Sequence, residues 1–154
     1  MIDDAIFKDV LGRFATGITV VATDGADGPK GITVNAFLSL SLRPPLVGVA
    51  IDRSADAHDG LHRSERYGVS ILSDTQAPLS NRFARRDGDG DPGWERLADA
   101  PVLAGAIGWL SCRIVQRVIT GDHTLFVAQV EAARTADGAP LAYFRGGYRR
   151  LQDD

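Results

Sequence analysis

The segment from Gly31 to Leu42 carries the pattern in this sequence that could most readily bind a ligand. Its residues alternate as in a β-strand, with an apolar face and a second face made of Thr33, Asn35, Phe37, Ser39 and Ser41. The second face is polar without charge, whereas a solvent-exposed face normally includes lysine or glutamate. It therefore suits a neutral ligand that forms hydrogen bonds. Alternatively, the segment is a barrel corner whose Asn35 and hydroxyl groups satisfy local backbone groups.

The histidines and the cysteine are the remaining candidates for chemistry. His123 follows Gly121 and Asp122 at a turn before a strand, so its ring either projects into a cleft or caps the turn. The residues around Cys112 alternate as in a strand and place Cys112 on its apolar side, so we expect a core thiol. With one cysteine and three scattered histidines, we expect no metal site.

These residues require a framework of strands. Residues 3–16 predict a docking helix with an apolar stripe, and residues 55–65 and 75–86 predict two short helices. Predicted strands are 18–23, 31–42, 46–51, 67–72, 107–120, 123–134 and 141–150, with a turn at 24–29 and a surface loop at 85–93. The chain of 154 residues is expected to be one domain, mainly β, that forms a closed antiparallel barrel with covering helices.

Composition narrows the class of partner. The formal net charge of −3 and the absence of a long basic run argue against a nucleic-acid partner. The N-terminus is acidic, and no apolar run is long enough to span a bilayer, so we expect no membrane partner and a cytoplasmic protein. The single cysteine fits a reducing compartment.

Several motifs, in order, resemble the flavin reductase-like FMN-binding split-barrel family. The resemblance covers roughly residues 5–151 and rests on the motifs at 14–21, 31–37, 39–41, 44–47, 52–58, 81–84, 121–123 and 143–148. It implies a split β-barrel. Ala36 stands where this family commonly has serine, and Ala57 where it commonly has threonine. These two departures predict a difference in flavin affinity or flavin choice.

The resemblance also implies which residues hold a flavin. The ring would lie against two largely backbone segments, Thr33, Val34, Asn35 and Ala36, then Ala50, Ile51, Asp52, Arg53 and Ser54. Ser54 and Arg82 would bind the phosphate, with help from His58; Ser54 is alternatively a helix N-cap and Arg82 part of a solvated helix face. The family motifs add the residues Ser39, Ser41, Phe83, Gly121, Asp122 and Tyr148.

The activity that the resemblance implies is hydride transfer from NADH or NADPH to FMN or FAD. His123 would lie beside the nicotinamide and position it, because the two cofactors carry the chemistry themselves. A separate reduced-flavin-dependent monooxygenase would be the partner. We also expect a homodimer, because the first helix has an apolar stripe and a small barrel cannot cover all its strand edges. The alternative is a split-barrel protein that binds flavin, deazaflavin or haem without catalysis.

Overall fold

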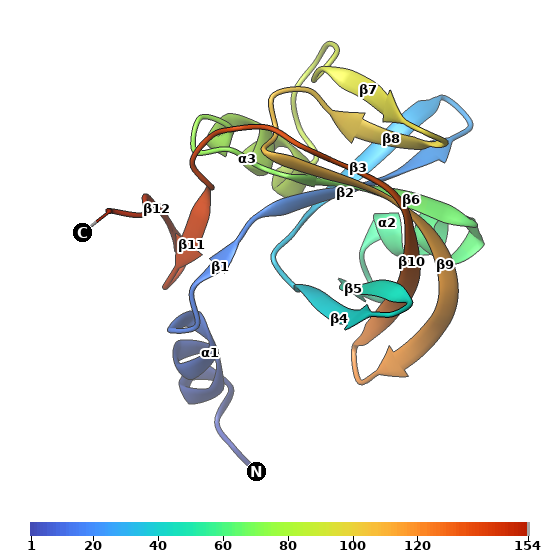
Figure 1. Ribbon diagram of the computed structural model, residues 1–154. Helices are drawn as coiled ribbons and strands as arrows, with labels where there is room; N and C mark the ends of the chain where they lie inside the picture. The colour runs from blue at the N-terminus through green and yellow to red at the C-terminus, as the bar shows by residue number, and fades with distance from the viewer. Residues whose placement is uncertain (154) are drawn as a thin grey trace.

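The computed structural model describes residues 1–153 and is mainly β, as predicted. The helices are α1 (Asp4–Gly12), α2 (Asp56–Arg63) and α3 (Ala77–Arg85) (Figure 1). The strands are β1 (Thr16–Gly17), β2 (Thr19–Gly25), β3 (Gly28–Val34), β4 (Phe37–Leu42), β5 (Pro45–Asp52), β6 (Arg66–Ile71), β7 (Trp94–Leu97), β8 (Ala100–Leu103), β9 (Gly108–Thr120), β10 (His123–Thr135), β11 (Ala142–Phe144) and β12 (Gly147–Arg149).

Seven strands form one antiparallel sheet in the order β3-β2-β6-β9-β10-β5-β4. Its edge strands, β3 and β4, are consecutive, and only Asn35 and Ala36 separate them. In a flat sheet these edges would lie about 29 Å apart, whereas a two-residue link spans about 10 Å. The sheet therefore curls so that its edges approach each other at this link. No ladder between β3 and β4 closes it among the described residues.

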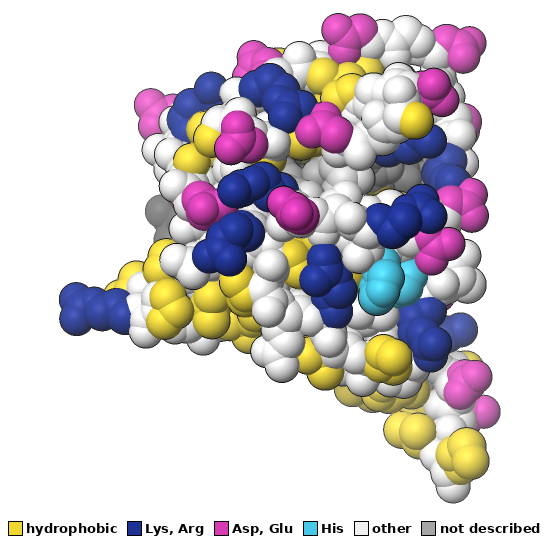
Figure 2. All heavy atoms as spheres, turned by 90° about the vertical axis from the view of Figure 1, so that its right-hand side faces the viewer, with side chains coloured by type: hydrophobic (Ala, Val, Ile, Leu, Met, Phe, Trp, Pro, Cys, Tyr) yellow, Lys and Arg dark blue, Asp and Glu magenta, His cyan; other side chains and the backbone are white. Residues whose placement is uncertain are grey.

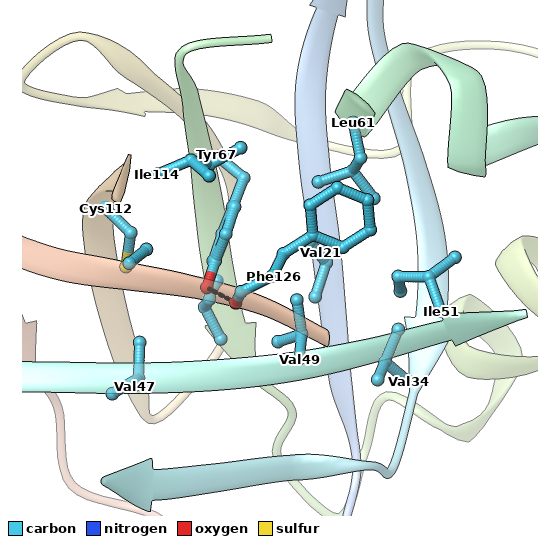
Figure 3. Packing of buried hydrophobic residues seen from close by; sticks show 12 residues of the cluster. Val21, Val34, Val47, Val49, Ile51, Leu61, Tyr67, Cys112, Ile114 and Phe126 are labelled. Carbon is cyan, nitrogen blue, oxygen red and sulfur yellow. Dashed lines mark hydrogen bonds between the residues drawn. The ribbon is translucent and has the colours of Figure 1, made fainter. Parts of the chain in front are cut away.

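The inside of the curled sheet holds the main core. Val21, Val49 and Phe126 project inward from three strands, and Leu61 reaches in from α2 (Figure 3). Tyr67 is fully buried there, and its hydroxyl donates a hydrogen bond to the backbone oxygen of Phe126 at 3.1 Å. Each large apolar side chain buried in this way stabilises the fold by about 1.5–3 kcal/mol. The helix α2 is thereby fixed over one end of the sheet.

Cys112 belongs to the same core and is fully buried. Burial raises the pKa of its thiol to about 12. The prediction of a core thiol is confirmed. Burial also raises the pKa of Tyr67, so the neighbouring phenol stays protonated as well.

A second cluster covers the outer face of β2. Ile18, Val20 and Leu103 are buried in it, and the partly buried aromatic rings of Phe83 and Tyr148 pack against them. Both faces of β2 are therefore covered, which explains why it is an almost continuous apolar run. This packing holds α3 and the C-terminal hairpin beside the edge of the sheet.

The helix α1 lies apart from both clusters. Asp3 caps it by accepting hydrogen bonds from the backbone N–H groups of Ala5 and Ile6, and the helix ends at Gly12 rather than at residue 16. None of its residues is buried, and Phe7 is 48% exposed. Figure 1 shows α1 pointing away from the sheet toward the N-terminus. Its apolar stripe has no partner within the described chain.

Two predicted strands are wrong, and one hairpin was not predicted. The segment 31–42 is two strands, because the chain leaves β2 at Val34 and joins β5 at Phe37. The break shifts the alternation, so Val34 and Phe37 both face the core. The segment 141–150 is a hairpin of β11 and β12, not one strand, because Arg145 and Gly146 turn with φ values of 50° and 77°. The sequence analysis also missed the hairpin β7–β8, whose strands have four residues each.

The surface agrees with the composition. Charged side chains of both signs are interspersed over much of the face in Figure 2, and hydrophobic ones gather along its lower edge. Among the described residues, no helix is long and apolar enough to cross a membrane.

Candidate functional site

A groove runs between the free edge of β3 and α3, and it contains two consecutive cavities. The first has a volume of about 480 Å³ and lies between the backbone of β3 at Lys30, Gly31 and Ile32 and the start of α2. The second, of about 340 Å³, continues past Thr33 and Asn35 to the C-terminal hairpin. Both are lined by α3. Volumes of this size are typical of small-molecule sites.

The open backbone of β3 forms one wall of this groove. β3 pairs with β2 on one side only, so every second N–H and C=O group along its other side has no strand partner. Across the opening, the pairing of β5 with β4 stops at Val49, and the Ala50 N–H donates to the Ala36 oxygen at 3.0 Å. Beyond this bond, Ile51 and Asp52 pair only with β10. The Ala50–Ala36 hydrogen bond therefore brings the two backbone segments predicted to hold the ring together, and of these residues Ser54 lines the first cavity while Thr33 and Asn35 line the second.

The predicted polar face of residues 31–42 does not exist as one surface. Thr33 lies toward α3, and its hydroxyl donates to the Ser80 oxygen at 2.6 Å. Asn35 lines the second cavity. Ser39 and Ser41 lie on β4, opposite Val47 and Leu46, and line neither cavity of the groove. The break at residues 35–36 separates these side chains.

The start of α2 forms one end of the first cavity. Ala55 is its N-cap and no side chain caps the helix, so the alternative interpretation of Ser54 as the cap is wrong. Instead, both the N–H and the hydroxyl of Ser54 donate to one oxygen of Asp52 at 2.8 Å. These two hydrogen bonds lower the pKa of Asp52. The uncapped N–H groups leave a favourable place for an anion.

Arg82 and Phe83 project from α3 and line the first cavity. The Arg82 guanidinium donates to the backbone oxygens of Asp89 at 3.2 Å and Gly90 at 2.6 Å, and so holds the loop after α3. A guanidinium has five N–H donors, so three remain for a ligand. The Phe83 ring packs edge-on against Trp94 at 5.6 Å. The phosphate role of Arg82 stays a prediction.

Tyr148 fixes the far end of the groove. Its hydroxyl lies 2.7 Å from the buried Ser80 hydroxyl and donates to the Asn81 side-chain oxygen at 3.0 Å. The hairpin that carries Tyr148 is thereby tied to α3. Tyr148 lines the second cavity together with Asn35, from a distant part of the chain.

The turn that carries His123 lies beside the end of β5. His123 stands opposite Asp52 in the ladder, and the Arg53 N–H donates to the Asp122 oxygen at 2.9 Å. The His123 Nδ1 lies 2.6 Å from the Asp122 carboxylate, so the tautomer with its proton on Nδ1 can donate a hydrogen bond to that carboxylate. Gly121 adopts a positive φ of 64° in the turn. The structure thus brings Asp52, Arg53, Gly121, Asp122 and His123 together, although His123 lines neither cavity.

His58 does not face the groove. Its Nε2 lies 2.8 Å from the Thr124 hydroxyl, and its ring packs edge-on against Phe126 at 5.7 Å. The side chain is 13% exposed. In this geometry it supports the packing of α2 on β10.

Residues that the sequence analysis missed complete the first cavity. Lys30 lines it from β3, and Trp94 from β7. Arg86, at the end of α3, forms an ion pair with Asp56 at the start of α2, and both line the cavity. No local pattern marks these residues, because only the folded arrangement brings them together.

An open strand edge, an uncapped helix N-terminus and nearby lysine and arginine side chains offer hydrogen-bond donors and positive charge to a phosphorylated ligand. The molecule is therefore a β-sheet protein with a groove suited to such a ligand.

The chain belongs to the flavin reductase like domain family, which matches residues 11–152. It is 40% identical to an NADH-dependent flavin reductase of a Rhodococcus species over 151 residues, 94% of this chain and 85% of that protein. It is also 40% identical to the reductase component of 4-hydroxyphenylacetate 3-monooxygenase from Thermus thermophilus, covering 94% of this chain and 95% of that protein. The structure of the Streptomyces globisporus NADH:FAD oxidoreductase in complex with NAD and FAD fragments matches with a TM-score of 0.90 at 33% identity, over 100% of this chain and 98% of that one.

Proposed function

We propose that this chain is an NADH-dependent flavin reductase that supplies reduced flavin to a separate monooxygenase. The observation that carries the proposal is the free edge of β3, whose backbone without a strand partner on that side lines a cavity of about 480 Å³ together with Ser54 and the start of α2. Family membership and the named relatives support the activity.

The groove suits the two ends of a flavin nucleotide. One edge of the ring alternates hydrogen-bond donors and acceptors, which the backbone of residues 33–36 and 50–52 can match without charge. The phosphate would lie at the start of α2, near Ser54 and Arg82. The charge-assisted hydrogen bonds formed there are about twice as strong as neutral ones.

The flavin, when bound, supplies an atom that accepts hydride from the nicotinamide, so the protein needs no nucleophile of its own. The role of the protein's own residues is to hold the flavin and the nicotinamide and to orient them toward each other. Phe83 and Tyr148 shield parts of the groove from water, and Asp122 fixes the orientation of the His123 ring. His123 would position the nicotinamide beside the ring, which lowers the entropic part of the barrier.

The proposal includes a single split-barrel domain. The curl of the seven-stranded sheet and the hydrogen bond from Ala50 to Ala36 support closure into a barrel that is split beside β3. The family match over residues 11–152 supports one domain. A cytoplasmic location stays a prediction from the sequence.

The proposal also includes a homodimer. The stripe of Phe7, Val10, Leu11 and Phe14 on α1 is exposed, with Phe14 at 78%. A second exposed group, Leu38, Leu40 and Leu42, lies on β4. Exposed apolar groups of this kind often mark an interface, and a second copy would cover them.

A flavin-binding experiment tests the function. The purified protein should oxidise NADH when FMN or FAD is added. Arg82→Ala should weaken FMN binding by about tenfold or more but leave riboflavin binding unchanged, because riboflavin lacks the phosphate. Arg85→Ala, on the same helix but outside both cavities, is the matched control. Flavin binding without NADH oxidation would instead indicate a carrier, and equal losses for FMN and riboflavin would contradict the phosphate role.

Light scattering tests the dimer. The wild type should have twice the mass of 16.5 kDa, and replacing Phe7 and Leu11 with Ser should shift it toward the monomer. Replacement of Lys8, on the same helix, is the control. A wild type that remains a monomer at micromolar concentration would contradict the proposal.

A further inference from the structure

The His58 side chain forms a hydrogen bond to which the proposed function gives no role. Its Nε2 lies 2.8 Å from the hydroxyl of Thr124, the residue that follows His123 at the start of β10. Among the described residues, this is the only hydrogen bond that joins a residue of α2 to a strand of the sheet. We propose that His58 is a positioning residue for hydride transfer: it fixes Thr124, and through Thr124 the place of His123 beside the nicotinamide. This inference rests on the proposed function.

The first argument is that this hydrogen bond is shielded from water. Thr124 is 3% exposed and the His58 side chain 13%. The His58 ring packs edge-on against Phe126, and Leu61 of the same helix belongs to the same core cluster as Phe126 (Figure 3). A shielded hydrogen bond is held in one geometry, because the loss of either partner leaves the other unpaired at a cost in free energy. The bond therefore keeps the first turn of α2 and the start of β10 at a fixed separation.

The second argument is the place of Thr124 in the chain. His123 is the first residue of β10 and follows the turn of Gly121 and Asp122, so the strand continues from it on one side only. Neighbouring residues of a strand point to opposite faces, so α2 can hold Thr124 while the His123 ring points away from α2. The peptide unit between the two residues is rigid. A shift of the Thr124 backbone therefore moves the Cα atom of His123 with it.

The third argument is the position of Asp52 between the two histidines. Its pKa is lowered mainly by the hydrogen bonds from Ser54, and positive charge on His123 and on His58 lowers it further. Both rings therefore lie near one carboxylate at the end of β5, although they come from β10 and α2. Because α2 begins at the first cavity, a bond between α2 and β10 at this point keeps the two ends of the proposed site in register.

The sequence analysis gave His58 a different role, in binding the flavin phosphate. The ring lines neither cavity of the groove. Its Nε2 lies beside the Thr124 hydroxyl, and its Nδ1 lies 3.5 Å from the Asp59 carboxylate. Both ring nitrogens therefore have partners within the chain, which favours positioning over contact with a phosphate.

Variants at each end of the hydrogen bond test the proposal. His58→Leu and Thr124→Val each remove one partner with little change in volume. Each should lower kcat/KM for NADH by about tenfold and change the Kd of FMN by less than about twofold. His58→Gln and Thr124→Ser keep a polar group at each position and should restore most of the loss. His62→Leu is the matched control and should leave kcat/KM unchanged, because His62 is an exposed residue of the same helix that stacks on His58 at 6.0 Å.

Two combinations of variants separate positioning from stability. The double variant His58→Leu with Thr124→Val leaves neither group of the pair unpaired, so its Tm should recover toward that of the wild type while kcat/KM stays low. In a His123→Ala background, His58→Leu should lower kcat/KM no further, because no ring remains to be positioned.

Other results would overturn the inference. An unchanged kcat/KM in His58→Leu with a lower Tm means that the hydrogen bond only stabilises α2. Losses that multiply with those of His123→Ala mean that His58 acts independently of that ring. A loss of FMN affinity with unchanged riboflavin affinity returns His58 to the flavin phosphate. Each of these results leaves the reductase function standing, whereas a wild type that does not oxidise NADH overturns the proposed function and the inference together.

Discussion

The contact between Tyr148 and α3 allows the loss of stability in a Tyr148→Phe variant to be predicted, because one of the two partners of the Tyr148 hydroxyl is buried. Tyr148→Phe removes one hydroxyl that accepts a hydrogen bond from Ser80 and donates one to Asn81. Ser80 is fully buried, and its hydroxyl has no other partner among the described residues. Asn81 is only half-buried and lines a cavity, so water can replace the lost bond there.

Most of the stability lost in Tyr148→Phe therefore comes from the Ser80 hydroxyl. A buried donor left without a partner lowers the free energy of unfolding by about 1–3 kcal/mol, whereas replacing the hydrogen bond to Asn81 with one to water lowers it little. For a chain of this length, 1 kcal/mol corresponds to about 2–4 °C in Tm. Ser80→Ala alone should lower the free energy of unfolding less than Tyr148→Phe does, because the Tyr148 hydroxyl still donates its hydrogen bond to Asn81. The double variant, Ser80→Ala with Tyr148→Phe, should be about 1 kcal/mol more stable than the sum of the two single effects predicts.

Urea unfolding at one fixed protein concentration measures all four proteins, because a dimer makes stability depend on concentration. Thr33→Val is a control for the neighbouring contact with the Ser80 backbone, and it should not couple to Tyr148. Single effects that add within about 0.3 kcal/mol, or a Tyr148→Phe protein as stable as the wild type, would refute the reasoning.

Two further predictions concern His123 and Asp52. His123→Ala should lower kcat/KM for NADH by about ten- to a hundredfold, or 1.4–2.7 kcal/mol, and change flavin affinity much less. An unchanged kcat/KM with a lower Tm would mean that the ring only caps its turn. The Ser54 hydrogen bonds lower the pKa of Asp52 in the folded state, so their contribution to stability is present above the unfolded pKa and is lost as pH falls through the folded value. Asp52→Asn should therefore flatten the acid limb of a stability–pH curve measured by urea unfolding; a wild-type slope in the variant would assign the effect to other carboxylates.

Much of the strand framework could be predicted from the sequence because periodicity reports burial directly. The run at residues 46–51 is apolar throughout and is strand β5, which is paired on both sides. The break at Asn35 and Ala36 could not be predicted in this way. Both flanking segments alternate, and only the pairing of one with β2 and the other with β5 reveals that the alternation shifts by one residue.

The candidate site was predictable where backbone segments form it and less so where side chains converge. The segments at residues 33–36 and 50–54 are joined by the Ala50–Ala36 hydrogen bond, while their role in binding a ring stays a prediction. The pair of Arg86 and Asp56, by contrast, joins two helices that have 13 residues of loop and strand between them. Such a pair leaves no periodic signal, since each residue resembles any other charged residue on a helix surface.

The candidate site lies where the curled sheet has a free edge, because the edge of β3 forms one wall of the groove. The curl of the sheet brings its edge strands together at the two-residue link of Asn35 and Ala36, and no ladder joins β3 to β4 among the described residues. The edge of β3, and the side of β5 at Ile51 and Asp52 that faces away from β10, have no strand partner, and such edges usually pair with another strand. In this protein α3, the start of α2 and the C-terminal hairpin line the groove beside that edge instead. Backbone groups of β3 that would pair with another strand in a closed barrel therefore remain available for hydrogen bonds to a ligand.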